Sequence, residues 1–214
     1  MKALKQVLVL LASLLSLVML LPGSPAWAAQ APAESPAAVP TVAGDPLNRK
    51  GMAFVVYDQT GEVTPAMKAL WKRQVRQAYP RAEYTFIDDP QAVQAASAVL
   101  SQSNSDDDHY TAAEFAAIGQ KAQADVVAVV IVKAMEEYYV EPMLMGWWDD
   151  GPDTWLRVLT AADLYLYKQE NQKFQHKNLR KVETTEVSLA VPPEREIQYA
   201  LSNLAMKMEN KPEI

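Results

Sequence analysis

The chain of 214 residues contains no cysteine, only two histidines and only seven glycines. Without cysteine it can form no disulfide, thiolate nucleophile, iron–sulfur cluster or cysteine-based zinc site. The glycines form neither of the glycine-rich motifs that cradle phosphates, which argues against nucleotide binding. Acidic residues outnumber basic ones by 26 to 20, whereas nucleic-acid binding depends on clustered lysine and arginine. The sequence therefore predicts no cofactor and no nucleic-acid partner.

The first 28 residues have the order of a bacterial signal peptide. Two early lysines precede an apolar run over residues 7–21, and Ala26-Trp27-Ala28 supplies a small–x–small cleavage site. The run would form a helix of roughly 22 Å, which is shorter than the roughly 30 Å hydrocarbon core of a bilayer. We therefore expect cleavage after Ala28, with no transmembrane segment left after cleavage. Because no cysteine follows the run, we also expect no lipid anchor.

The remaining chain divides into a leader and one domain. Residues 29–48 are rich in alanine and proline and cannot bury enough apolar area to offset their ordering entropy, so we expect a disordered leader. Residues 49–210 are expected to form a single domain. An exported chain of this kind would be periplasmic or secreted, and cleavage would lower its net charge from −6 to −8.

The domain shows the element order β-α-β-α-α-β-β-β-α, which predicts an α/β sandwich with helices packed on a mixed sheet. Seven consecutive apolar residues at 126–132 indicate a strand buried on both faces. Thr64-Pro65 and the capping box Thr111–Glu114 mark helix starts. The expected strands are 52–57, 83–87, 126–140, 154–168 and 174–189, and the expected helices are 65–79, 89–100, 112–124 and 193–208.

The last two expected strands form a long hairpin. Residues 154–168 alternate apolar and polar side chains, whereas residues 174–189 are much more polar. The polar strand is expected near a sheet edge, where Lys177, Arg180 and Lys181 would discourage pairing with another sheet. His176 lies in the same strand, and its neighbouring lysines indicate a solvated residue and not a catalytic base.

The pattern resembles the amino-terminal domain of TolB and, more broadly, the curli-secretion group of envelope proteins. The residues that carry the resemblance are Phe54-Val55-Val56, Ala124-Asp125-Val126-Val127, Asp163-Leu164-Tyr165 and the helix from Glu194. The chain departs from the group because it has no glycine in the helix-to-strand connection, no following propeller and no cysteine to lipidate. The resemblance implies a non-enzymatic envelope protein that docks partners, and it transfers no catalytic residue.

One acidic segment is a candidate metal site. Asp106, Asp108 and His109 combine hard carboxylates with an imidazole, a set that suits divalent cations. Consecutive residues rarely converge on one ion, and the calcium-loop template fails because glycine is missing at its sixth position. The alternative interpretation is a solvated acidic loop before a helix N-terminus, where negative charge is favourable.

A second segment is a candidate partner-binding loop. Met143, Leu144, Met145, Trp147 and Trp148 combine adaptable methionine with rigid tryptophan. They either fold back over a sheet edge or contact a partner, and the tryptophans could also stack on a sugar. Acids near this loop could serve glycoside hydrolysis, but their spacing gives no geometry.

The sequence contains no complete reactive constellation, so the leading hypothesis is an exported, non-catalytic cell-envelope protein that acts as a binding or assembly module for an envelope partner. The alternatives are a periplasmic protein that binds a small ligand or carbohydrate and a metal-assisted hydrolase that uses the aspartate-rich loops. Metal titration and tryptophan fluorescence would separate these classes.

Overall fold

The computed structural model describes residues 42, 45–102, 109–140 and 155–212. Within these residues the element order is the one that the sequence predicts, β-α-β-α-α-β-β-β-α. The elements are β1 (Lys50–Asp58), α2 (Pro65–Ala78), β2 (Tyr84–Phe86), α3 (Asp89–Leu100), α4 (Ala112–Ala122), β3 (Val126–Val140), β4 (Trp155–Lys168), β5 (Lys173–Glu186) and α5 (Pro193–Met208).

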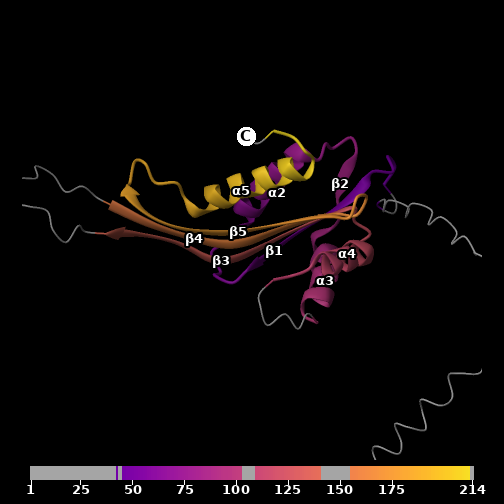
Figure 1. Cartoon of the computed structure of the whole chain (residues 1–214), viewed down its shortest axis with the longest axis horizontal. Coiled ribbons are helices and arrows are strands. Elements are labelled where there is room, and N and C mark those ends of the chain that lie inside the picture. Colours follow the sequence, from indigo (N-terminus) through magenta and orange to yellow (C-terminus); the bar gives the residue numbers. More distant parts are fainter. Residues whose placement is uncertain (1–41, 43–44, 103–108, 141–154, 213–214) are drawn as a thin grey trace, which may run out of the picture. The chain divides into compact units, whose positions relative to one another are not determined.

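The five strands form one mixed sheet in the order β2-β1-β3-β4-β5. β1 pairs in parallel with β2 and β3, while β3–β4 and β4–β5 are antiparallel. Helices α2 and α5 cover one face of the sheet, and α3 and α4 lie against the other face (Figure 1). The fold is therefore the α/β sandwich that the sequence predicts.

Strand β3 is buried on both faces, as its apolar run predicts. Its alternate side chains belong to two separate cores, because Val126, Ala128 and Val130 face α2 and α5, whereas Val127 and Val129 face α3 and α4. The largest buried side chains of the helices join the same two cores. Those on the α2 and α5 side include Trp71, Val75, Ile197 and Leu201, and those on the α3 and α4 side include Ala96, Phe115 and Ile118.

Two helix starts follow the predicted capping chemistry. The hydroxyl of Thr64 accepts a hydrogen bond from the backbone N–H of Met67, which is one of the unpaired donors at the start of α2. At the start of α4, the backbone N–H of Thr111 donates to the carboxylate of Glu114 at 2.6 Å. This contact confirms the capping box.

The polar strand of the hairpin is shorter than the sequence predicts. β5 ends at Glu186, and residues 187–189 form a turn in which Leu189 N–H donates to the carbonyl of Glu186. The predicted strand end at residue 189 is therefore wrong, because an apolar residue can also occur in an exposed turn. Leu189 is exposed.

Several other predictions fall on residues outside the described part of the chain. These are the signal peptide, most of the leader, Asp106 and Asp108, and the whole candidate loop from Met143 to Trp148. Within the described ranges, no helix is long and apolar enough to cross a membrane.

Candidate functional site

A buried carboxylate is the centre of a polar cluster on the sheet. Asp163 of β4 is 1% exposed, and its Oδ2 lies 2.9 Å from Nζ of Lys133 on β3. Its Oδ1 accepts a hydrogen bond from Nδ2 of Asn178 at 2.5 Å and lies 3.5 Å from Nε2 of His176, both on β5. These four residues, which we call the Asp163 cluster, bring three neighbouring strands together at one point.

Lys133 lies at an irregularity in β3. The register of the β3–β4 ladder shifts between Val132 and Ala134, so Lys133 is the extra residue of a β-bulge. Burial opposes ionisation of Asp163, but hydrogen bonds and charge from Lys133, together with hydrogen bonds from Asn178 and His176, outweigh it and lower the pKa of Asp163. The carboxylate is therefore held ionised and paired.

His176 is exposed on β5, as the sequence predicts, and it also belongs to the cluster. Its ring stacks on Tyr165 with centroids 4.4 Å apart and an interplanar angle of 10°, although its neighbours in sequence are charged. The ring of His109 lies 5.5 Å from the ring of His176. Thus the structure brings one residue of the predicted metal site beside an imidazole from a distant strand. Among the residues that the structure describes, no group of three or more His, Asp or Glu side chains could hold a metal ion.

A signal for this cluster was present in the sequence. The four-residue turn at 169–172 sets Lys168 opposite Lys173, and counting back along both strands places Tyr165 opposite His176 and Asp163 opposite Asn178. The hairpin register could therefore have identified three of the four residues of the cluster. Lys133 lies two residues beyond Ile131, the ladder partner of Asp163, so strand alternation places it on the same face, but the pairing of β3 with β4 has to be known first.

A hollow of about 390 Å³ lies at the carboxyl end of β1, on the face that carries α3. Its lining includes the Tyr57 hydroxyl, which lies 3.3 Å from the Ser97 hydroxyl, and the side chain of Ile131, which is paired with Asp163 across the sheet. In open α/β sheets this crevice is where ligands most often bind. The hollow and the Asp163 cluster are thus neighbours on one face.

The loop that follows β1 is held by Asp58, the last residue of that strand. The carboxylate of Asp58 accepts hydrogen bonds from the backbone N–H groups of Thr60, Gly61 and Val63. Burial opposes ionisation of Asp58, but these bonds and one from the Thr60 hydroxyl outweigh it, so the pKa of Asp58 is lowered. The Asp58 carboxylate is therefore engaged in fixing its own loop.

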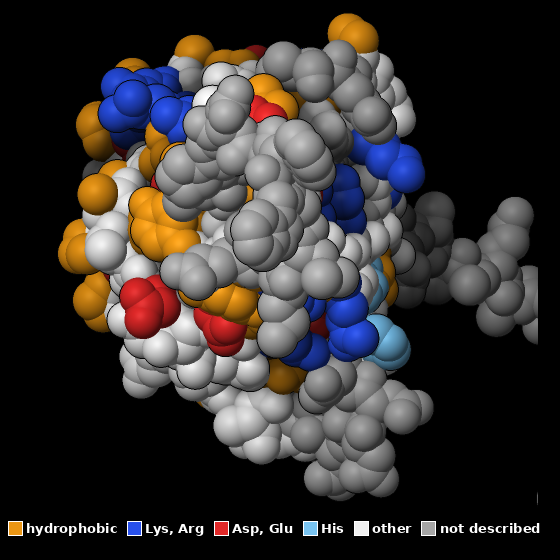
Figure 2. All heavy atoms as spheres, turned by 90° about the vertical axis from the view of Figure 1, so that its left-hand side faces the viewer, with side chains coloured by type: hydrophobic (Ala, Val, Ile, Leu, Met, Phe, Trp, Pro, Cys, Tyr) orange, Lys and Arg blue, Asp and Glu red, His pale blue; other side chains and the backbone are white. Residues whose placement is uncertain are grey.

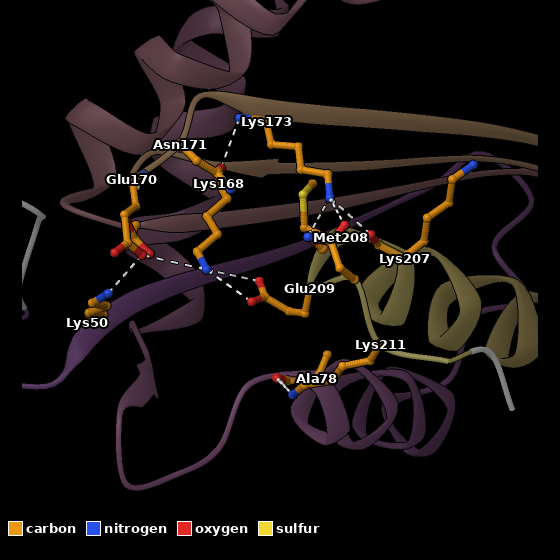
Figure 3. A network of polar contacts seen from close by, with 12 residues as sticks. Lys50, Ala78, Lys168, Glu170, Asn171, Lys173, Lys207, Met208, Glu209 and Lys211 are labelled. Atoms are coloured by element: carbon orange, nitrogen blue, oxygen red, sulfur yellow. Dashed lines mark hydrogen bonds and ion pairs between the residues drawn. The ribbon is translucent and has the colours of Figure 1, made fainter.

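A second charged network lies at the opposite end of the sheet (Figure 3). Nζ of Lys168 is 3.1 Å from both carboxylate oxygens of Glu209 and 3.6 Å from Glu170, which also pairs with Lys50 at 2.9 Å. The network therefore joins β1, β4 and the end of α5. Its charges alternate and are paired with one another, which is the arrangement of a structural network.

Asp125 lies beneath this network and joins three parts of the chain. Its backbone N–H donates to the carbonyl of Gly51, its carbonyl accepts from Gln169 N–H at 2.7 Å, and its Oδ1 accepts from Glu170 N–H at 3.2 Å. Burial raises the pKa of Asp125. The Ala-Asp pair before the valine run therefore fixes the β4–β5 turn against the starts of β1 and β3.

The outer part of the hairpin carries exposed apolar side chains. Tyr138 is 45% exposed and Val182 is 58% exposed on one face, and Tyr139 is 70% exposed on the other. Figure 2 views the molecule from the end where β4 begins, and it shows most of the hydrophobic side chains at the left, with Lys and Arg side chains at the upper left and along the right. Val140 pairs with Trp155, so the sequence from 141 to 154 joins two strands at this end.

No family model matches the chain, and no curated protein matches it. Similar solved structures include the hypothetical protein CT253 from Chlamydia trachomatis, with 11% identity over 75% of this chain and 97% of that one and a TM-score of 0.38. The PelC dodecamer from Paraburkholderia phytofirmans has 12% identity over 75% and 83% of the two chains and a TM-score of 0.31. Lipoprotein GNA1162 from Neisseria meningitidis has 15% identity over 66% and 87%, with a TM-score of 0.31.

These likenesses are too distant to assign a function. None of these three structures carries the name of TolB or of a curli-secretion protein, so that resemblance stays a prediction from the sequence.

Proposed function

We propose that this protein is an exported, non-catalytic binding or assembly module of the bacterial cell envelope, and that it contacts its partner with the outer part of its hairpin. This surface, which we call the hairpin extension, comprises residues 134–140 of β3, 155–161 of β4 and 180–186 of β5. The observation that carries the proposal is the exposure of Tyr138 and Val182 on one face of this extension.

The composition of that face suits a protein partner. Tyr138 pairs with Arg157, and Val182 pairs with Leu159, so aromatic, aliphatic and guanidinium groups alternate over two neighbouring rows. Tyrosine and arginine are among the residues that most often carry binding energy at interfaces. A contiguous group of exposed apolar side chains with charged neighbours is typical of a protein contact.

The predicted partner-binding segment is connected to the same place. Met143, Leu144, Met145, Trp147 and Trp148 lie in the sequence between Val140 and Trp155, which are paired strand residues at the end of the hairpin extension. The segment is thus joined in sequence to the end of the exposed sheet face, which supports their use as one contact surface.

Site-specific photo-crosslinking in cells of the source bacterium tests the proposal. A photoreactive residue at position 138, 147 or 182 should capture the same envelope protein, because all three positions would belong to one interface. Tyr199 on α5 is a matched control, since it is 55% exposed and lies on a helix. Capture from position 199 but from none of the three would contradict the proposal.

Serine substitution provides a second readout. The double variant with Tyr138→Ser and Val182→Ser should lose capture from position 147 while its urea unfolding midpoint stays close to that of the wild type, because both side chains are exposed. Turnover of any envelope substrate by the purified protein, abolished by Asp163→Asn, would replace a binding function with an enzymatic one.

The hollow beside β1 favours a second candidate function, the binding of a small polar ligand. Its volume of about 390 Å³ could admit a sugar or an amino acid, and the Tyr57 and Ser97 hydroxyls could orient it. Calorimetric titration with monosaccharides and amino acids tests this function. Binding that Ser97→Leu abolishes would support it, and the absence of heat with every ligand would reject it.

A further inference from the structure

One edge of β1 lacks a paired strand over most of its length. β1 has nine residues, but β2 has only three, and their pairing ends with Met52 opposite Phe86. The N–H of Ile87 then donates to the carbonyl of Met52 at 3.0 Å, and the chain leaves the sheet to begin α3 at Asp89. Within the described residues, no strand pairs with β1 on this side beyond Met52.

The orientation of the β1 backbone identifies which groups face that edge. Lys50 N–H donates to the carbonyl of Glu83, and the Met52 carbonyl accepts from Ile87, so these two residues face β2. Because the backbone groups of alternate strand residues face the same neighbour, the N–H and C=O of Phe54 and Val56 also face this side. Four strand hydrogen-bonding groups are therefore directed at the edge.

Helices on opposite faces of the sheet form the walls of a groove along this edge. The groove has a volume of about 270 Å³ and an apolar floor of Phe54 and Val56. Ala69 of α2 and Val93 of α3 line it from the two sides. The groove thus lies where a longer β2 would continue.

The groove has a basic wall. Lys68 and Lys72 line it from α2, which contains no acidic residue, while Asp89 lines it from α3. Lys72 is paired with Asp89. Lys68 is exposed and has no ion pair with a described residue. The lining of the groove therefore carries one net positive charge, which belongs to Lys68.

We propose that this groove binds an extended, acidic segment of a partner protein, which adds a strand to the sheet along β1. The segment forms backbone hydrogen bonds with Phe54 and Val56, places apolar side chains against the floor and directs a carboxylate at Lys68. Main-chain pairing supplies the affinity in such added strands, and alternate side chains supply the specificity.

A second copy of this chain fits the groove poorly. The β1 edge is recessed between α2 and α3, so two such edges cannot approach each other. The other edge of the described sheet, β5, carries Lys177 and Arg180, whose positive charge does not complement the basic wall of the groove. A single extended peptide meets neither obstacle.

Amide hydrogen exchange followed by nuclear magnetic resonance tests the proposal on the full chain. The probe is a seven-residue peptide of alternating valine and glutamate with blocked ends, and its control is the same peptide with lysine in place of glutamate. The acidic peptide should slow exchange of the Phe54 and Val56 amides by about tenfold or more, because hydrogen-bonded strand amides are protected. The basic peptide should leave them unchanged.

Charge variants test whether Lys68 itself attracts the acidic peptide. Lys68→Glu should weaken binding of the acidic peptide about fivefold, the scale of one exposed ion pair, and should favour the basic peptide. Lys121→Glu on α4 changes the net charge equally and should have no effect. The proposal fails if the Phe54 and Val56 amides are already slow to exchange in the free protein, if their protection rises with protein concentration, or if the peptide protects β5 instead.

This inference goes beyond the proposed function and can fail separately from it. The groove lies along the edge of β1 that faces β2. The hairpin extension belongs to β3, β4 and β5, which follow the opposite edge of β1 in the strand order. Loss of peptide binding in Lys68→Glu should leave crosslinking from positions 138 and 182 intact.

Discussion

The ammonium group of Lys133 lies 2.9 Å from the buried carboxylate of Asp163, although a β-bulge separates Lys133 from the regular ladder that positions Asp163. Lys133 lies two residues beyond Ile131, the ladder partner of Asp163, so strand alternation places its side chain on the same face as the carboxylate. The ion pair therefore joins two neighbouring strands at the point where the ladder becomes irregular.

Asp163→Asn should lower the free energy of unfolding by about 1–3 kcal/mol at pH 7, measured by urea denaturation. The variant loses the ion pair of a buried carboxylate, but Lys133 is partly exposed and keeps some hydration. Glu183→Gln is the matched control, because its partner Lys181 and its own carboxylate are both partly exposed. It should cost about 1 kcal/mol or less.

The effect of Asp163→Asn should depend on pH in one direction. Because the pKa of Asp163 is lowered in the folded protein, its ionised form contributes stability above the unfolded-state pKa of about 3.9, and that stability is lost as the pH falls through the folded value. The difference between wild type and variant should therefore shrink below about pH 4. A constant difference from pH 7 to pH 3 would show that the carboxylate charge is not responsible.

Lys168→Met should destabilise the protein at neutral pH by about 1–2 kcal/mol, because Glu209 loses its partner. Burial opposes protonation of Lys168, but its hydrogen bond and charge interaction with Glu209 outweigh it and raise its pKa. The stabilisation is therefore complete below the unfolded-state pKa of about 10.4 and is lost as the pH rises through the folded value. Urea titrations between pH 7 and 11 should show the two proteins converging only at the alkaline end.

Gly51→Ala should cost about 2–3 kcal/mol, because a Cβ at this position would lie 2.5 Å from the backbone oxygen of Gln123, the C-cap residue of α4, and backbone must shift to relieve the contact. Gly61→Ala provides a contrast, since no atom lies within 4 Å of its Cβ position and only its positive φ of 79° is unfavourable. That variant should cost about 1 kcal/mol. Equal thermal shifts for the two would contradict the close approach at Gly51.

Replacing Lys177 and Arg180 together by valine should promote self-association. β5 is an edge strand within the described sheet, and basic side chains along an edge discourage pairing with other chains. Light scattering should show aggregates in this double variant at concentrations where the wild type remains monodisperse. Arg73→Val with Lys121→Val removes the same charge from helix surfaces and should remain monodisperse.

Local sequence signals were sufficient to predict the elements but not their arrangement. The run at 126–132, the Thr111–Glu114 box and the Thr64 cap identify strands and helices because burial, alternation and capping act over a few residues. The neighbouring positions of β1 and β3 could not be predicted in the same way, since more than 60 residues separate them in the chain and their pairing depends on long-range packing.

The same distinction between local signals and long-range packing applies to the candidate surfaces. Tyr165 and His176 face each other because a short turn fixes their register, which is readable from the sequence. The approach of His109 to His176 and the groove beside Phe54 depend on where α3 and α4 pack and on how early β2 ends. No pattern of residue spacing indicates either feature, so the sequence predicts neither of them.

Asp125 anchors the starts of β1 and β3 and the β4–β5 turn at one end of the sheet, far along the strands from the pair formed by Val140 and Trp155. The alignment of the hairpin is thereby set from its anchored end. The closure entropy of a connection at the other end grows only slowly with its length. Relatives of this protein can therefore diversify that connection, and with it their choice of partner, without redesigning the sheet.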